Sequence, residues 1–144
     1  MIGTRPVSVI VPTYNRDKLL SRCLTSILAA SEDNDEILVI DNGDTGRTMD
    51  VVAAFSDPRI RYVKEKDQGV SIARNFGMSI AMNDRIAFID DDDEWHPHKL
   101  LIQRTLLDRH PEAVGCFSNI WATDPTGRIK RNYLFEWGQP VQDW

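Results

Sequence analysis

The sequence predicts an α/β domain built on a mostly parallel β-sheet that is flanked by helices. Short apolar runs alternate along the chain with segments whose apolar residues recur at helical spacing, which is the pattern of strand-helix units joined by right-handed crossovers. Polar residues directly follow three of the apolar runs, at Thr13-Tyr14-Asn15, Asp41-Asn42 and Asp90–Asp93. Because ligands bind at the carboxyl ends of parallel strands, these three positions predict one binding edge.

The first half of the chain contains three predicted strands and two predicted helices. Val7–Val11 is a β-branched run that stops at Pro12, as expected of a strand buried on both faces of a parallel sheet. Asn15 is expected to cap a helix whose apolar stripe runs from Leu19 to Leu28. The other elements expected here are a strand at Glu36–Ile40, a short helix at Met49–Phe55 and a strand at Ile60–Val63.

The second half begins with a predicted helix from about Val70 to Met82 and a buried strand at Ile86–Ile89, which runs directly into the acidic residues. Pro97 is expected in the first turn of the helix that follows. Two more strands are expected at Val114–Ser118 and, after a turn at Pro125–Gly127, at Ile129–Leu134.

Length and composition predict a single globular domain that covers residues 1–144. The chain is 42% hydrophobic and 27% charged, which allows one packed core. Its formal net charge of −5 argues against nucleic acid as a partner, although an acidic chain can bind an anionic ligand through a divalent cation. No apolar stretch has the length of a membrane span, and no signal-peptide core is present. We expect a cytoplasmic protein, with the inner face of a membrane as an alternative location.

The run from Asp90 to Glu94 is the strongest candidate for a functional site. Two carboxylates about 4 Å apart repel by roughly 1 kcal/mol in water and by roughly 4 kcal/mol at an effective dielectric constant of 20. A strand end crowded with such groups therefore favours a bound cation, and ligands that are all oxygen select Mg²⁺ or Mn²⁺. The alternative is a solvated acidic loop.

Other candidate residues carry two interpretations each. Asp41 could accept a hydrogen bond from the imide of a uracil-like base, or it could cap its own turn. Tyr14 could stack on a base or pack at the sheet edge, and Arg74 could reach a phosphate or lie in solvent. Gly77 lies within a predicted helix, where glycine costs about 1 kcal/mol relative to alanine, so it indicates close packing.

Three segments together resemble family 2 glycosyltransferases with the GT-A fold. Val7–Arg16 is similar to the opening strand of that family, and Ser71–Gly77 is similar to its middle helix. Phe88–Trp95, followed by Pro97, resembles its metal-binding DXD segment. The resemblance covers roughly residues 5 to 120, and three motifs in the right order make it specific. It implies a Rossmann-like nucleotide-sugar-binding sheet.

The resemblance also implies a function: inverting transfer of a sugar from a metal-bound nucleotide-diphospho-sugar, with UDP-type donors favoured, to a hydroxyl of a saccharide or lipid-linked acceptor. The implied cofactor is Mg²⁺ or Mn²⁺. Carried over by position, the implied donor-binding residues are Pro12, Thr13, Tyr14, Asn15, Asp41, Gly69, Arg74, Asn75, Asp90 and Asp91, and the implied metal ligands are Asp92 and Asp90.

The chain departs from the family pattern at two places. Asn42-Gly43-Asp44 stands where the family more often has an Asp-Gly-Ser turn. The family's general base lies well beyond the DXD segment, and the late carboxylates Asp124, Glu136 and Asp143 have no recognisable context. We therefore expect the base beyond Trp144 and the acceptor-side region to be missing from this chain. The alternative hypothesis is a non-catalytic nucleotide- or metal-binding module, or a truncated fragment that binds the donor without transfer.

Overall fold

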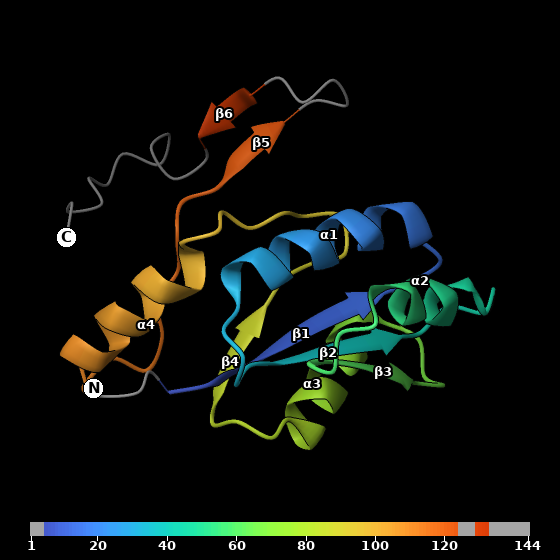
Figure 1. The fold of residues 1–144 in the computed structure, drawn as a ribbon, viewed down its shortest axis with the longest axis horizontal. Helices are drawn as coiled ribbons and strands as arrows, with labels where there is room; N and C mark the ends of the chain where they lie inside the picture. The colour runs from blue at the N-terminus through green and yellow to red at the C-terminus, as the bar shows by residue number, and fades with distance from the viewer. Residues whose placement is uncertain (1–4, 124–128, 133–144) are drawn as a thin grey trace. The chain divides into compact units, whose positions relative to one another are not determined.

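The computed structural model describes residues 5–123 and 129–132, and Figure 1 shows the fold. The chain divides into two compact units, residues 1–105 and 106–144. The first contains a four-stranded parallel sheet, and the second contains a two-stranded antiparallel sheet. Within the described residues, no helix combines the length and apolar character that crossing a membrane requires.

The parallel sheet has the strand order β3-β2-β1-β4. Its strands are β1 (Val7–Thr13), β2 (Glu36–Asp41), β3 (Ile60–Lys64) and β4 (Arg85–Phe88). All residues of β1 and β2 are buried, which explains their continuous apolar character. These four strands confirm the predicted parallel α/β architecture, and their bounds differ from the predicted ones by one or two residues.

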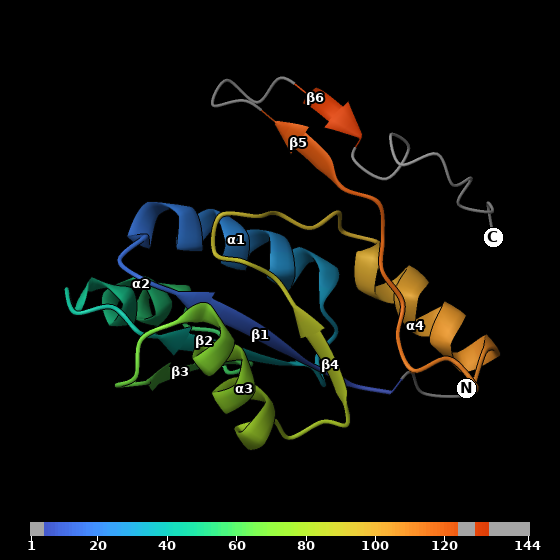
Figure 2. The ribbon, with the colours of Figure 1, turned by 180° about the vertical axis from the view of Figure 1, so that it is seen from behind.

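Helices cover both faces of the parallel sheet, and each face has its own hydrophobic core (Figure 2). On one face, α1 (Asp17–Ala30) and α2 (Arg47–Phe55) pack on the sheet. On the other face, α3 (Val70–Ile80) packs Ala73 against the side chains of Ile10 and its neighbours on β2. The three-layer arrangement leaves the carboxyl ends of the strands as the polar edge of the domain.

A buried ion pair lies at the opposite, amino-terminal edge of the sheet. Arg104 is on α4 (Lys99–Arg109), and it donates hydrogen bonds to Asp35 and, through Nη1 at 2.9 Å, to Glu32. The Asp35 carboxylate also accepts from the backbone N–H of Val7 at 2.8 Å. This cluster therefore ties α4 to the start of β1 and to the loop before β2.

The predicted helix starts need two corrections. Asn15 does not cap α1: the N-cap is Arg16, which makes no side-chain capping bond, because Asn15 adopts a positive φ of 54° and its amide bonds elsewhere. Pro97 precedes α4, which begins only at Lys99.

The strand predicted at Val114–Ser118 was wrong. This segment is irregular, and Val114 and Phe117 are almost fully exposed, because no strand within residues 5–123 and 129–132 pairs with the apolar run. The strand β5 instead lies at Trp121–Thr123 and pairs antiparallel with β6 (Ile129–Asn132). The latter agrees with the start of the predicted strand at 129–134. The residues expected to form a turn at 125–127 lie outside the described part of the chain, as do the late carboxylates at 124, 136 and 143.

Gly77 packs where its sequence position indicated a close approach. A Cβ atom at this position would lie 2.6 Å from Cγ2 of Ile10, a buried residue in the middle of β1. We predict that Gly77→Ala lowers the free energy of unfolding by about 1–3 kcal/mol through overpacking, although alanine is the better helix former. Denaturant unfolding would measure this, with Ser71→Ala, an exposed change on the same helix, as the control expected to stay within about 0.5 kcal/mol. A stabilised Gly77→Ala protein would contradict the predicted packing.

Candidate functional site

The register of the parallel sheet brings three strand ends to one edge. Thr13 at the end of β1 pairs with Asp41 at the end of β2, and the acidic run follows β4 after Ile89, whose N–H donates to the carbonyl of Ile10. A cavity of about 660 Å³ opens at this edge. It is lined by Pro12, Thr13, Tyr14, Arg16, Asn42, Gln68, Gly69, Val70, Asp90, Asp91 and Asp92.

The cavity separates the residues named from the sequence into two groups. Those that line it are Pro12, Thr13, Tyr14, Gly69, Asp90, Asp91 and Asp92, whereas Asn15, Asp41, Arg74 and Asn75 do not. Four lining residues were not named as site residues: Arg16, Asn42, Gln68 and Val70. The position of Asn42 directly after a predicted strand was an available signal, because it shares a strand end with Asp41.

Asp91 is buried and both of its carboxylate oxygens have partners. Its Oδ2 accepts a hydrogen bond of 2.7 Å from the hydroxyl of Thr13, and its Oδ1 accepts from Nη1 of Arg16 at 3.2 Å. These bonds join the end of β1 to the loop after β4. Asp91 is therefore held in place by the protein, with little of its carboxylate left to bind an ion.

Asp90 and Asp92 are more accessible, each with 46% of its side chain exposed. Asp92 Oδ2 accepts from Nη1 of Arg16 at 2.7 Å, and Asp90 Oδ1 accepts from Nη2 of Arg74 at 2.5 Å. The charge of Asp91, and then that of Asp92, raises the pKa of the Arg16 guanidinium. Two arginines from different helical segments thus partly neutralise the acidic run.

The crowding of negative charge is visible in the neighbours of these residues. Desolvation, and then the charges of Asp92, Asp90 and Asp91, raise the pKa of Asp93. Burial also raises the pKa of the Cys23 thiol, whose Sγ lies 3.5 Å from the backbone oxygen of Asp90. The thiol beneath the acidic run therefore stays protonated and serves as packing.

The acidic wall fits a divalent cation that arrives with other ligands. Within the described residues, no group of three His, Cys, Asp or Glu side chains is placed to hold a metal ion by itself. The accessible oxygens of Asp92 and Asp90 are hard donors of the kind that Mg²⁺ and Mn²⁺ prefer. Such an ion needs several more oxygen ligands, which water and phosphate can supply.

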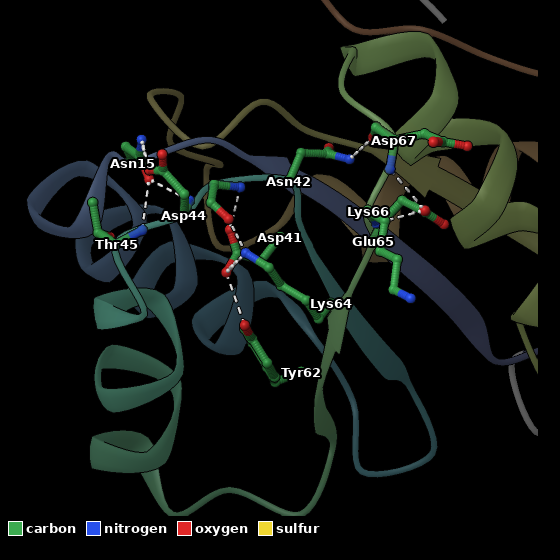
Figure 3. Close-up of polar contacts among 11 residues, drawn as sticks. Asn15, Asp41, Asn42, Asp44, Thr45, Tyr62, Lys64, Glu65, Lys66 and Asp67 are labelled. Carbon is green, nitrogen blue, oxygen red and sulfur yellow. Dashed lines mark hydrogen bonds and ion pairs between the residues drawn. The ribbon is translucent and has the colours of Figure 1, made fainter.

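Asp41 is fully buried and does not line the cavity, and three groups hold its carboxylate (Figure 3). Its Oδ1 accepts from the N–H of Gly43 at 2.8 Å. Its Oδ2 accepts from the hydroxyl of Tyr62 at 2.8 Å and from Nζ of Lys64 at 3.3 Å. Burial, together with the bond to Asp41, raises the pKa of Tyr62 to about 12. Asp41 therefore orders the turn that follows β2, as the capping interpretation proposed.

Two asparagines shape the loops around the cavity (Figure 3). The amide of Asn15 donates to Oδ1 of Asp44 at 2.9 Å and accepts from the N–H of Asp44 at 3.1 Å, which links the loops after β1 and β2. Asn42 donates from Nδ2 to the backbone oxygen of Asp67, which links the loops after β2 and β3. The wall of the cavity is consequently cross-linked by amides as well as by ion pairs.

Residues at the amino end of α3 also line the cavity. Gly69 is the N-cap of this helix and has a φ of 130°, a backbone conformation that residues with a Cβ atom rarely adopt. Arg74 lies one turn farther along the helix and reaches Asp90, whereas Asn75 is exposed. Gly69 thus brings the chain sharply from the cavity wall into α3.

A parallel α/β sheet with an acidic cavity at its carboxyl edge defines a domain suited to metal-assisted binding of a phosphorylated nucleotide. Comparison with known families makes this more specific. The model of "Glycosyl transferase family 2" matches residues 8–143. The chain belongs to glycosyl transferase family 2.

Known proteins agree with this assignment. The chain is 36% identical over 102 residues to the Escherichia coli UDP-Glc:alpha-D-GlcNAc-diphosphoundecaprenol beta-1,3-glucosyltransferase WfgD, a match that covers 70% of this chain and 40% of WfgD. In eight curated relatives, including WfgD, the match to this chain covers only 14% to 41% of the relative's length.

Two solved structures show the same fold. S. aureus TarS superposes with a TM-score of 0.68 and 25% identity, over 74% of this chain and 33% of TarS residues 1–349. The mannosyltransferase PcManGT from Pyrobaculum calidifontis, in complex with GDP-Man and Mn²⁺, superposes with a TM-score of 0.62 and 27% identity, over 69% of this chain and 31% of its own. The fold is that of the GT-A glycosyltransferases, as the sequence motifs implied.

The bond between Thr13 and Asp91 is expected to support the cavity. Thr13→Val leaves a buried carboxylate oxygen without its donor, which costs about 1–3 kcal/mol in the free energy of unfolding. Thr13→Ser keeps the hydroxyl and should retain most of the stability. Thermal and denaturant unfolding of both variants would test this, and equal losses would mean that packing of the threonine methyl group matters more than the hydrogen bond.

Proposed function

We propose that this chain is the donor-binding part of an inverting glycosyltransferase and that it binds a nucleotide-diphospho-sugar through a divalent cation. The acidic wall of the cavity is the observation that carries this proposal. Three carboxylates line it, and Arg16 is the one cation among the described lining residues. A diphosphate would be repelled from this wall unless a divalent cation lay between the two.

The proposal gives the lining residues distinct roles. Asp92 and Asp90 would hold Mg²⁺ or Mn²⁺, which when bound would stabilise the negative charge of the departing diphosphate. Asp91, fixed by Thr13, would contact the ribose or position its two neighbours. Tyr14 is half-exposed at the cavity wall, so its ring is available to stack on the base.

The remaining donor-site residues named from the sequence have positioning roles in this proposal. Pro12 and Gly69 shape the cavity, which both of them line. Asn15 orders the adjoining loops, and Arg74 acts through Asp90. Asn75 is exposed on α3 and lies outside the cavity lining, so the proposal gives it no direct contact with the donor.

Uracil is the favoured base of the donor, with guanine as the second candidate. WfgD is described as a UDP-Glc enzyme, and PcManGT was solved with GDP-Man. Both bases present a ring N–H that needs an acceptor, N3–H in uracil and N1–H in guanine. Asp41 would influence this contact through the turn that it holds, because the residue that lines the cavity after β2 is Asn42 and not Asp41.

Transfer also requires an acceptor and a general base. The described carboxylates that line the cavity all have roles on the donor side, so we propose that the base comes from a segment outside the described residues. A saccharide or lipid-linked acceptor is proposed, and WfgD is described as acting on a diphosphoundecaprenol-linked sugar. The alternative is binding without transfer. A glycosylation assay with lipid-linked acceptors would separate the two, because a binding module would bind the donor but transfer no sugar to the acceptor.

Asp92→Ala should reduce Mn²⁺-dependent binding of UDP by about tenfold or more, since it removes a principal metal ligand. The fold should remain intact, because the change also relieves repulsion within the acidic run. Calorimetric titration with UDP, in the presence of Mn²⁺ and then of EDTA, would measure the effect. Asp93→Asn is the matched control, since Asp93 is exposed and does not line the cavity. Unchanged metal-dependent binding by Asp92→Ala would place the ion elsewhere.

Asp41→Ala should weaken the binding of UDP more than that of ADP. If the carboxylate acts through the turn, Asn42→Ala should reproduce the loss of selectivity, whereas Asp41→Ala should also lower the melting temperature. Titration of both variants with UDP, GDP and ADP would measure selectivity directly. Equal losses for all three nucleotides would remove both residues from base recognition.

A further inference from the structure

Arg16 occupies an unusual position between the two halves of the candidate site. It follows the strand end at Thr13, caps α1 through its backbone oxygen, and extends its side chain across the cavity wall to the loop after β4. Its Nη1 lies 3.2 Å from Asp91 Oδ1 and 2.7 Å from Asp92 Oδ2. Half of the Arg16 side chain is exposed, and the residue lines the cavity.

The two contacts of Arg16 differ in how easily they can be broken. Asp91 is buried and is also held by Thr13, so its position does not depend on the arginine alone. Asp92 is half-exposed, and solvent screens its contact with the half-exposed guanidinium. The contact with Asp92 is therefore the exchangeable one, and it involves the carboxylate assigned to the metal ion.

We propose that Arg16 is an exchangeable counter-ion that gives up Asp92 to the divalent cation and then pairs with the diphosphate of the donor. This inference rests on the proposed donor-binding function. In the protein alone, the guanidinium neutralises Asp92 and competes with a cation for it. When cation and nucleotide are both bound, the arginine remains on the cavity wall, where a diphosphate offers it the bidentate oxygen geometry that guanidinium groups prefer.

Arg74 does not fulfil the same role, although it contacts the neighbouring Asp90. Its side chain does not line the cavity, so it has no direct access to a bound diphosphate. Arg16 is the one residue among those described at the cavity that can contact both the acidic ligands and an anionic ligand in the same space.

The exchange predicts that binding of the cation and binding of the nucleotide are coupled. A cation alone has to displace Arg16 without compensation, whereas a cation that arrives with a nucleotide diphosphate provides a new partner for the arginine. Cation and nucleotide should therefore strengthen each other's binding, and by the same factor in both directions. Removal of the guanidinium should tighten the binding of the cation alone and weaken the binding of the nucleotide.

Arg16→Gln tests the proposal, with Arg22→Gln as the matched control. Arg22 lies on the same helix and pairs with Glu94, but it does not line the cavity. Electron paramagnetic resonance of free Mn²⁺ measures binding of the ion alone, and titration with UDP and GDP at saturating Mn²⁺ measures the nucleotide. We expect Arg16→Gln to bind Mn²⁺ alone about three- to tenfold more tightly and the nucleotide about three- to tenfold more weakly. Arg22→Gln should match the wild-type protein within about twofold.

Arg16→Lys provides the second variant. It keeps the positive charge, so its affinity for Mn²⁺ alone should stay close to the wild-type value, while the lysine's point charge should only partly restore nucleotide affinity. Thermal unfolding of each variant confirms that the fold is retained.

The outcomes separate the counter-ion proposal from the proposed function. Unchanged or weaker binding of Mn²⁺ alone by Arg16→Gln would overturn the competition between arginine and cation. Tighter Mn²⁺ binding with unchanged nucleotide affinity would overturn the transfer of Arg16 to the diphosphate. If the wild-type protein binds Mn²⁺ but neither nucleotide, the donor-binding function fails, while the Mn²⁺ measurements still decide whether Arg16 competes for Asp92.

Discussion

β1 hydrogen-bonds to β2 on one side and to β4 on the other, both in parallel, and this double pairing determines where three loops begin. The strand is buried along its whole length, so its register is specified by apolar packing on both faces. A slip of one residue would turn Thr13 away from Asp91 and separate the strand ends. The geometry of the cavity is therefore a consequence of how one central strand packs.

The cavity edge concentrates negative charge that the fold can tolerate only with compensation. Hydrogen bonds from Thr13 and Arg16 hold Asp91, and two arginines partly neutralise its neighbours. These contacts stabilise the protein by itself, but half-exposed ion pairs contribute little. The same weakness that makes them poor stabilising interactions makes Asp92 and Asp90 available to a ligand. A stronger, buried network would favour stability over binding.

The parts of the fold that follow from local pattern could be predicted from the sequence. Continuous apolar runs gave the four parallel strands, and the run at Asp90 gave one wall of the cavity because its residues are adjacent in the chain. Long-range side-chain contacts were harder to predict. Adjacent residues in an extended chain point to opposite sides, so the sequence could not show whether Asp41 or Asn42 faces the cavity. Arg16 could not be identified as a cavity residue from the sequence, because its partners Asp91 and Asp92 lie about 75 residues away in the chain.

The failure at Val114–Ser118 has the same origin, because a strand exists only with a partner and composition does not reveal one. The success at Gly77 is instructive in the opposite sense. A glycine in a helix indicated that something lay close to the backbone, and the structure identifies it as Ile10. The absence of a side chain at Gly77 thus indicated a close contact between α3 and β1 that the pattern of apolar residues does not specify.

Buried polar contacts hold the chain on both sides of the loop from Asp92 to His98, through Thr13 and Asp91 just before it and through Arg104 and Asp35 in the helix after it. These contacts fix the chain before and after the loop, so the distance that the loop spans is constant. The half-exposed side chain of Asp92 can adjust to a ligand by rotation, which takes nanoseconds or less and leaves both fixed ends in place. The acidic wall can thus change partners without refolding any part of the sheet.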